Sequence, residues 1–386
     1  MVKMFFILFG VLAFCQAVCG QSVSKVWVAD RKDGTYMNPV LHADYSDPDV
    51  CAVGDDFYMT ASSFNCTPGL PILHSKDLVN WKLVNYALKT IEPEEFYNKP
   101  QHGKGVWAPS IRYHNGEFYI YWGDPDFGIF MVKAKDPQGE WDKPVLVKAG
   151  KGMIDPTPLW DEDGKVYLVH AWAGSRAAFN SVVTVCEMNP EGTKVISEPV
   201  LVFDGNDGVN HTVEGPKFYK RNGYYYILAP AGGVVTGWQL ALRSKNVYGP
   251  YEVKRVMAQG STDINGPHQG AWVETNSGES WFVHFQDKAM YGRVIHLNPV
   301  KWTEGWPVIG EDKDGDGCGE PVRRYRKPNV GKTYPVETPA ESDEFNSRRL
   351  GLQWEWHANY QDAFGFTSDL GYMRIYGHVL SEDFVN

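Results

Sequence analysis

Three carboxylic acids and an imidazole stand at the openings of five similar stretches of the chain. The stretches open at Asp47, Ala108, Asp155, Glu214 and His268, with intervals of 61, 47, 59 and 54 residues. Acids so far apart in sequence can act together only if the fold brings the openings to one place. For any single one of them, a hydrogen-bonding role in a turn is the alternative.

Carboxylates that leave room for a water molecule between them suit the hydrolysis of glycosidic bonds. One acid protonates the leaving oxygen, and the other activates water or attacks the sugar. A third acid nearby raises the pKa of the group that must stay protonated. The 14 Trp, 21 Tyr and 19 Phe add flat rings that pack on sugars, although we expect most of them in the core.

The five stretches share a layout of four short strands. A polar turn containing Gly joins the first strand of each stretch to an aromatic-rich second strand. These turns are Gly54-Asp55, Asn115-Gly116, Asp163-Gly164, Asn222-Gly223 and Ser277-Gly278. Asn-Gly and Asp-Gly between apolar alternations are typical of hairpins, and four strands repeating every ~40 to 60 residues are typical of propeller blades. We therefore predict an all-β chain with a five-bladed β-propeller, whose first strands line one channel; a two-sheet sandwich is the alternative.

Composition excludes other classes of protein. With 43% hydrophobic and 22% charged residues, the 386-residue chain is globular. Its net charge of −10 and the lack of a basic cluster exclude nucleic acid as a partner. The 39 Gly and 24 Pro are spread along the chain, which excludes long helices.

The first twenty residues predict export. Lys3 precedes a short apolar run over residues 4–14, and small residues follow, as in a secretory signal peptide. The protein is then secreted or periplasmic. A lipid anchor at Cys19 is the alternative. No later segment is long and apolar enough for a membrane helix, so we expect no transmembrane segment.

Several motifs together resemble glycoside hydrolase family 43. They are Tyr45-Ser46-Asp47-Pro48-Asp49-Val50, Ser75-Lys76-Asp77-Leu78-Val79-Asn80-Trp81, Val106-Trp107-Ala108-Pro109, Ile154-Asp155-Pro156, Val213-Glu214-Gly215-Pro216 and Tyr248-Gly249-Pro250-Tyr251. The likeness covers roughly residues 36 to 330, within a catalytic propeller that we assign to residues 21–332.

The resemblance implies an enzyme that inverts the anomeric centre of β-D-xylosides or α-L-arabinofuranosides. By motif, Asp47 would be the general base, Glu214 the general acid, and Asp155 the residue that raises the pKa of the acid and orients it or the sugar. The resemblance also points to Trp107 and Arg293 as sugar contacts.

Two further residues are substrate-binding candidates through the same resemblance. His268 stands where relatives place a channel histidine, sometimes beside a bound calcium or water cluster; a channel histidine with no direct role is the alternative. Phe64 looks like a subsite aromatic of the xylosidase-like branch, and a core position is its alternative.

A calcium loop is suggested by Asp312, Asp314 and Asp316, with Gly317 after them. Acids at positions 1, 3 and 5 and Gly at position 6 copy the first half of such a loop. The residue that should be the bidentate Glu is Arg323, so we expect weak structural calcium binding or simply a solvated acidic loop. The reaction itself requires no cofactor.

The composition changes after the propeller. Pro335, Thr338 and Pro339 predict a linker over residues 333–342, and residues 343–386 look like the beginning of a C-terminal β-sandwich. Only about half of a ~100-residue sandwich is present, so its apolar residues need another surface. We therefore expect this partial module to be disordered or to pair with a neighbouring molecule.

Two functions from different classes follow from the sequence. The first is a secreted glycosidase that cleaves terminal xylosyl or arabinofuranosyl residues from plant hemicellulose. Its partners would be arabinoxylan and xylo- or arabino-oligosaccharides. The alternative is a catalytically silent carbohydrate-binding propeller. The presence of all three acids favours the enzyme.

Overall fold

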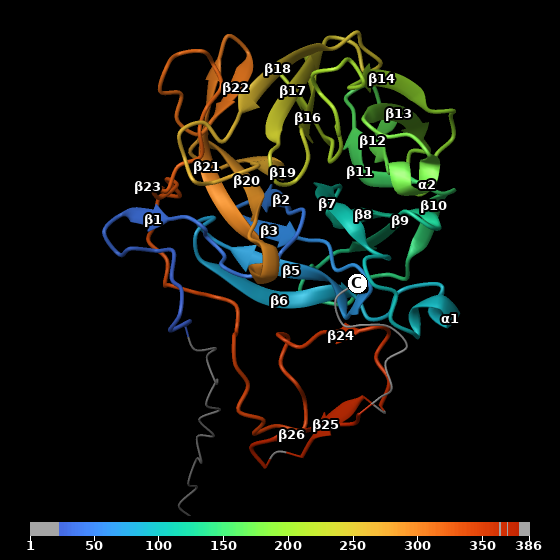
Figure 1. Ribbon diagram of the computed structural model, residues 1–386, viewed down its shortest axis with the longest axis vertical. Helices are drawn as coiled ribbons and strands as arrows, with labels where there is room; N and C mark the ends of the chain where they lie inside the picture. Colours follow the sequence, from blue (N-terminus) through green and yellow to red (C-terminus); the bar gives the residue numbers. More distant parts are fainter. Residues whose placement is uncertain (1–22, 363, 369, 378–386) are drawn as a thin grey trace, which may run out of the picture.

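The computed structural model describes residues 23–362, 364–368 and 370–377. The predicted signal peptide, including Cys19, and the last residues of the predicted sandwich lie outside this range. Five antiparallel four-stranded sheets stand around a central axis (Figure 1). The predicted all-β five-bladed propeller is confirmed.

Each blade is built from strands that follow one another in the chain, with the first strand innermost. Blades one and two comprise β2 (Asp49–Val53), β3 (Asp56–Thr60), β5 (Gly69–Ser75), β6 (Trp81–Leu88), β7 (Trp107–His114), β8 (Glu117–Asp124), β9 (Gly128–Ala134) and β10 (Val145–Ala149). Blade three comprises β11 (Met153–Trp160), β12 (Val166–Trp172), β13 (Val182–Met188) and β14 (Val200–Asp204). Blades four and five comprise β15 (Lys217–Arg221), β16 (Tyr224–Ala231), β17 (Trp238–Ser244), β18 (Glu252–Met257), β19 (His268–Glu274), β20 (Ser280–Asp287), β21 (Arg293–Thr303) and β22 (Trp306–Ile309).

The predicted hairpin turns join the first two strands of every blade. In blades two and four both turn residues have positive φ, 49° and 85° at Asn115-Gly116 and 50° and 75° at Asn222-Gly223. This pair of values is that of the type I′ turn, which matches the twist of the flanking strands. Large buried side chains such as Trp81 and Trp281 fill the spaces between neighbouring blades.

Helices are few and short in the described part of the chain. They are α1 (Glu94–Tyr97), α2 (Gly174–Ala177) and the 3-10 turn η1 (Ala289–Tyr291). None of the described segments forms a helix long and apolar enough to cross a membrane.

Pairing between distant segments closes the ring. Residues 40–45 run beside β21 of the last blade, with Val40 N–H donating to Ile295 O (2.7 Å) before the chain enters blade one. Next to them β1 (Thr35–Met37) pairs with β23 (Arg324–Arg326), which follows the last blade. Both ends of the propeller are therefore held to each other.

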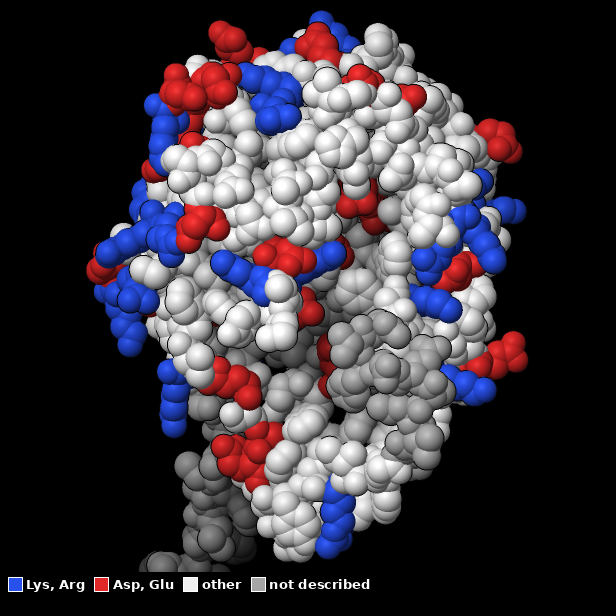
Figure 2. Space-filling model, in the orientation of Figure 1, with Lys and Arg blue, Asp and Glu red and all other residues white. Residues whose placement is uncertain are grey.

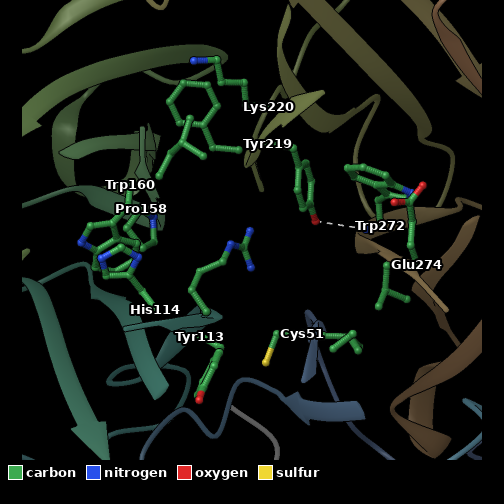
Figure 3. Close-up of a pocket in the computed structure, with 15 residues that line it drawn as sticks. Cys51, Tyr113, His114, Pro158, Trp160, Tyr219, Lys220, Trp272 and Glu274 are labelled. Carbon is green, nitrogen blue, oxygen red and sulfur yellow. Dashed lines mark hydrogen bonds between the residues drawn. The ribbon is translucent and has the colours of Figure 1, made fainter. Parts of the chain in front are cut away.

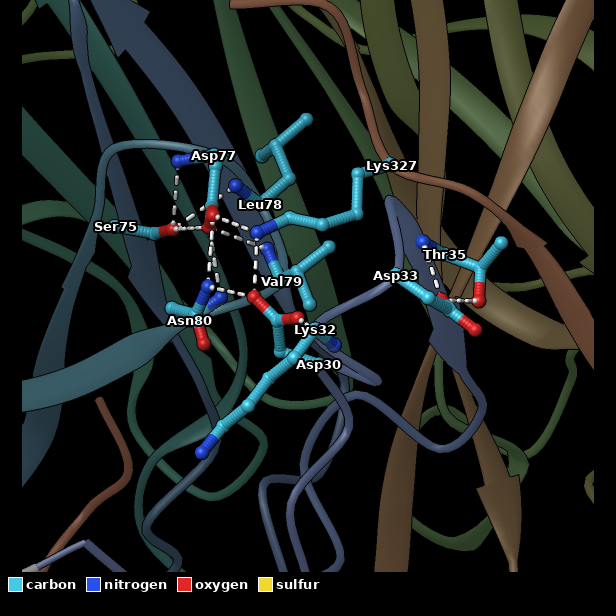
Figure 4. A network of polar contacts seen from close by, with 10 residues as sticks. All are labelled: Asp30, Lys32, Asp33, Thr35, Ser75, Asp77, Leu78, Val79, Asn80 and Lys327. Carbon is cyan, nitrogen blue, oxygen red and sulfur yellow. Dashed lines mark hydrogen bonds and ion pairs between the residues drawn. The ribbon is translucent and has the colours of Figure 1, made fainter. Parts of the chain in front are cut away.

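A buried polar network supports this closure (Figure 4). The carboxylate of Asp77 accepts the backbone N–H groups of Val79 and Asn80, which folds the turn before β6. Lys327 Nζ lies 2.7 Å from Asp77 Oδ2 and 2.6 Å from Asp30 Oδ2. One lysine from beyond the last blade thus joins the first blade to the segment that precedes it.

The segment after the propeller differs from the expected module. Its described strands are β24 (Trp356–His357), β25 (Gly365–Thr367) and β26 (Met373–Ile375), and β25 and β26 pair as a small hairpin below the propeller (Figure 1). β24 instead pairs with β4 (Cys66–Thr67) of blade one. A β-sandwich is not confirmed by the described residues.

The expectation that this segment would be disordered or pair with another molecule is wrong for residues 356–359. Ala358 and Asn359 are almost completely buried against the propeller. Asn359 exchanges two hydrogen bonds with the backbone of Ile91 (2.8 and 2.9 Å), and Thr67 Oγ1 donates to Ala358 O. The physical reason is that the propeller itself offers an unpaired strand edge and backbone groups that need partners.

Candidate active site

A cavity of about 240 Å³ opens at one end of the central channel. All five blades contribute to its wall, through Asp47, Phe64, Trp107, Ala108, Ile154, Asp155, Glu214, Gln269 and Arg293. In the space-filling view, acidic side chains lie in a hollow at the centre of this propeller face (Figure 2). The three acids singled out from sequence therefore meet in one place.

A bend in the backbone at the mouth of the channel recurs in every blade. Asp47, Ala108, Asp155, Gly215 and Gln269 have φ between 27° and 59°, the left-handed region. Outside glycine this conformation costs roughly 1–3 kcal/mol and is typically kept at functional sites. The register of strand pairing shifts at the bend in blades two, three and five, where one or two residues of the first strand have no partner.

The five residues that open the blades do not occupy equivalent backbone positions, contrary to the expectation from sequence. Asp47 and Asp155 occupy the bend itself in their blades. Glu214 and His268 stand one residue before it, since Gly215 and Gln269 have the left-handed conformation. The side chain of Glu214 therefore enters the cavity from a different backbone position than the other two acids.

Asp47 accepts hydrogen bonds from three neighbouring side chains. Its Oδ2 accepts the hydroxyl groups of Ser46 (2.7 Å) and Ser62 (2.6 Å), and its Oδ1 accepts Arg293 Nη1 (3.0 Å). Only 9% of the side chain is exposed. Hydrogen-bond donors and a guanidinium both stabilise the ionised form of a carboxyl group.

Asp155 is buried beside Glu214. Its Oδ2 accepts the backbone N–H of Gly215 (2.7 Å). Burial raises the pKa of Asp155 well above its ordinary value, and the negative charge of Glu214 is the second cause of this rise. Asp155 therefore retains its proton to a higher pH than an isolated aspartate does.

His268 contacts Glu214 rather than the cavity. Its Nε2 lies 3.0 Å from Glu214 Oε1, and the residue is 1% exposed. It is absent from the cavity wall, so the expectation of direct substrate contact is not supported for this residue. The geometry makes His268 a positioning residue for Glu214.

Two aromatic candidates line the cavity as expected. Phe64 exchanges backbone hydrogen bonds with Val106 (3.0 and 2.9 Å), which brings a loop of blade one beside the start of blade two. The next residue, Trp107, donates from its indole to Gly103 O (2.9 Å) and lies under the guanidinium of Arg176. Phe64 is half-buried on the cavity wall, so its alternative as a core residue is not supported.

Sequence reasoning missed three polar residues of this site. Ser62 joins two blades, since its hydroxyl donates to Asp47 and accepts the N–H of Ala108 (2.8 Å). Ser46 also binds Arg293 Nη1 (2.7 Å). Gln269 lines the cavity, and its buried Nε2 has no partner among the described residues. The sequence offered one indication of two of them, since Ser46 and Gln269 are the chain neighbours of Asp47 and His268.

The three acids of the suggested calcium loop lie far along the chain from the cavity, in an exposed turn after blade five. One carboxylate oxygen from each of Asp312, Asp314 and Asp316 lies within 4.8 Å of the others. Asp312 already accepts the N–H groups of Gly315 (2.8 Å) and Gly317 (3.0 Å). Arg323 pairs with Asp263 instead of adding a ligand.

The sequence of this chain matches a known protein family. The sequence profile described as Glycosyl hydrolases family 43 matches residues 36–307, well over half of the 386 residues. The chain belongs to this family. The resemblance inferred from the motifs is confirmed, and all three acids fall within the matched segment.

Relatives in family 43 carry two different activities in their names. A protein of Xylanibacter ruminicola is 41% identical over 355 residues, 91% of this chain and 64% of the relative. The non-reducing end alpha-L-arabinofuranosidase of Bacteroides ovatus is 34% identical and covers 92% of this chain and 68% of its own length. The crystal structure of the xylan beta-1,4-xylosidase from Bacillus halodurans C-125 superimposes with a TM-score of 0.78 at 27% identity, over 89% of this chain and 69% of that one. The chain thus spans about two thirds of the length of each relative.

Proposed function

We propose that this chain is a glycosidase that removes terminal xylosyl or arabinofuranosyl residues from hemicellulose with inversion. The observation that carries the proposal is the meeting of Asp47, Asp155 and Glu214 from three blades on the wall of one cavity. Membership of family 43 supports the same reaction class. A binding protein would gain nothing from three buried or half-buried acids that crowd one another.

Asp47 is the general base of the proposed reaction. Its carboxylate takes a proton from a water molecule while the water oxygen bonds to the anomeric carbon. Arg293 and the two serine hydroxyls fix the orientation of the Asp47 carboxylate. The bond from the anomeric carbon to the leaving oxygen breaks in the same step.

Glu214 is the general acid that gives its proton to the leaving oxygen. Its side chain is 27% exposed, which lets it reach a bound glycoside, and His268 holds one of its oxygens. Asp155 lies beside Glu214 and accepts the N–H of Gly215, the next residue in the chain, and so orients the acid. After the step Asp47 carries the proton from water, and exchange with solvent restores both groups.

The size of the cavity supports removal of a single terminal sugar. Its volume of about 240 Å³ lies below the roughly 300–1,000 Å³ typical of sites for larger ligands. Phe64 and Trp107 provide flat rings on its wall. Family relatives named for xylosidase and for arabinofuranosidase activity leave these two sugars as the candidates.

A panel of aryl glycosides tests the proposal. We expect hydrolysis of the xyloside or the arabinofuranoside and none of the galactoside. Proton NMR should show the inverted anomer as the first product. No hydrolysis of any member would contradict the assignment as an enzyme, and a retained anomer would contradict the role of Asp47 as a base.

We further propose export and weak calcium binding, both on sequence grounds. Residues 1–20 have the pattern of a signal peptide, with a lipid anchor at Cys19 as the alternative, and the N-terminal sequence of the exported protein would distinguish the two. Three carboxylates fit Ca²⁺ but provide fewer than its usual ~6 to 8 oxygens. Binding should therefore appear as a rise in Tm with CaCl₂ that Asp314→Ala removes.

A further inference from the structure

A second cavity, of about 380 Å³, lies at the other end of the central channel. Each innermost strand contributes three residues to it, and among these are Cys51, Tyr113, Trp160, Tyr219 and Trp272. These residues follow the five openings by four or five positions along the same strands. At ~3.3 Å per residue the two cavities are roughly 15 Å apart, too far for one sugar ring to touch both.

Aromatic rings form opposite walls of this second cavity (Figure 3). On one side Trp160 and His114 are stacked, with ring centroids 4.6 Å apart and planes at 11°. On the other side Tyr219 and Trp272 pack edge to face at 5.2 Å. Tyr113 is 44% exposed at the rim. Flat apolar rings of this kind pack on the C–H faces of sugars.

Hydrogen-bond donors without acceptors lie among these rings. Arg112 lines the cavity and donates from Nη1 to Asp49 Oδ2 (2.6 Å) and to Ile111 O (2.7 Å). Its Nη2, and Nε1 of Trp272, have no partner among the described residues. Native proteins seldom leave a buried donor without a protein, water or ligand acceptor.

Arg112 and Lys217 meet one carboxylate at the inner end of the cavity. This carboxylate belongs to Asp49, whose Oδ2 lies 2.6 Å from Arg112 Nη1 and 3.8 Å from Lys217 Nζ. Asp49 and Lys217 are completely buried, and the charges of Asp155 and Asp47 also act on Lys217. The charges at the rim are already paired. Arg221 lies 2.7 Å from Glu274, and Lys220 pairs with Asp161.

We propose that this second cavity binds an acidic sugar, a uronate. The carboxylate of the uronate accepts hydrogen bonds from Arg112, and its ring packs against Tyr113 and Trp160. Charge-assisted bonds to a guanidinium give geometric specificity for a carboxylate. The site is distinct from the catalytic cavity, so it would hold an acidic branch of a polysaccharide on the face of the propeller opposite the acids.

Calorimetric titration of the full chain with a matched pair of ligands tests the proposal. The probes are methyl β-D-glucuronide and methyl β-D-glucoside, which differ only in the carboxylate. We expect the glucuronide to bind about tenfold more tightly than the glucoside, and less tightly at high salt. Binding is measured directly, so the result is independent of whether the catalytic cavity hydrolyses any glycoside.

Variants locate the binding. Tyr113→Ala removes the exposed ring, and Arg112→Lys keeps the charge next to Asp49 while removing the planar fork. Each should weaken glucuronide binding about fivefold or more. Tyr248→Ala is the matched control, because Tyr248 is similarly exposed (36%) and also packs on one ring, far from this cavity.

Three results would overturn the proposal. They are equal affinity for the two probes, no binding of the glucuronide at all, and equal loss of binding in Tyr113→Ala and Tyr248→Ala. Unchanged hydrolysis of an aryl glycoside by Tyr113→Ala would confirm that this variant is folded. If no glycoside is hydrolysed, an unchanged Tm provides the same control.

Discussion

Glu214 is the acid of this site that a bound glycoside can reach most easily. Its side chain is 27% exposed, against 9% for that of Asp47, while Asp155 is almost fully buried. Glu214→Gln removes the transferable proton and keeps the shape. We expect kcat on a natural oligosaccharide to fall about 10²- to 10⁴-fold, with a much smaller loss on an aryl glycoside whose leaving group needs little protonation.

Steady-state kinetics on a series of aryl leaving groups measures this difference. Glu117→Gln is a suitable control, because Glu117 pairs with Lys133 (2.8 Å) at a distance from the cavity. Equal losses on good and poor leaving groups would show that Glu214 is not the acid.

Burial of Asp155 has a consequence for stability. The folded state raises the pKa of this carboxyl well above 3.8, so the folded protein keeps a proton that the unfolded chain releases. The stability contributed by Asp155 is therefore complete below pH 3.8 and is lost as pH rises through the higher, folded-state pKa. Asp155→Asn cannot ionise and still accepts the N–H of Gly215.

We expect the Tm of Asp155→Asn, relative to that of the parent chain, to increase from pH 4 to pH 8. Thermal unfolding followed by circular dichroism over this range measures the difference. The same variant should lose about 10²-fold or more in kcat, because it removes the carboxyl group that lies beside the proposed acid Glu214. A Tm difference that does not change with pH would show that Asp155 ionises in the folded protein as it does in the unfolded chain.

The sequence predicted the three acids but not their supporting hydroxyl groups. Carboxylates at repeated positions are a strong chemical signal, whereas a serine such as Ser62 is common in any chain. Its role depends on a contact with Asp47 that exists only after two loops come together. For His268 the sequence indicated a position in the channel but not the partner of the side chain. In the structure its ring faces Glu214.

Strand β24 is the element through which the C-terminal segment contacts the loop that carries Phe64. It pairs with β4, two residues after Phe64, and the following Asn359 satisfies the N–H and C=O of Ile91. Asn359→Ala would leave these buried groups without partners, at a cost of about 1–3 kcal/mol each. We expect Tm to fall by several degrees.

The matched control is Gln361→Ala. Gln361 is an exposed neighbour that donates one hydrogen bond to Asn98 O (3.0 Å). Its replacement should change Tm little, because water can satisfy an exposed carbonyl. If both variants melt at the same temperature as the parent chain, β24 does not stabilise the propeller.

The elements differ in how far the sequence predicts them. The hairpins of all five blades follow from local turn chemistry, because a pair such as Asn115-Gly116 favours positive φ by itself. The left-handed bend at Asp47 or Gln269 has no local signal, since those residue types do not require it. The pairing of β24 with β4 joins segments almost 300 residues apart, and no periodicity within either segment indicates it.

At the scale of the whole molecule, the segment after the propeller contacts both blade one and the described residues that precede the propeller. Ser24 donates its backbone N–H to Thr338 Oγ1 (2.7 Å) and its hydroxyl to Glu341 (2.6 Å). Further along, Leu352 O accepts the hydroxyl of Tyr86 (2.9 Å). Residues 333–361, which we call the strap, thus contact both the segment before the propeller and its first blade.

A chain that ends at Lys332 tests this strap. Removal of the strap exposes the edge of β4 and the backbone groups of Ile91, and it frees the loop that carries Phe64. Unpaired strand edges promote aggregation, so we expect lower solubility and a lower Tm than for the full chain. On an aryl glycoside, KM should rise more than kcat falls, because Phe64 lines the cavity while the three acids stay on the propeller. A shortened chain that matches the full chain in Tm, solubility and KM would show that the propeller builds its substrate cavity alone.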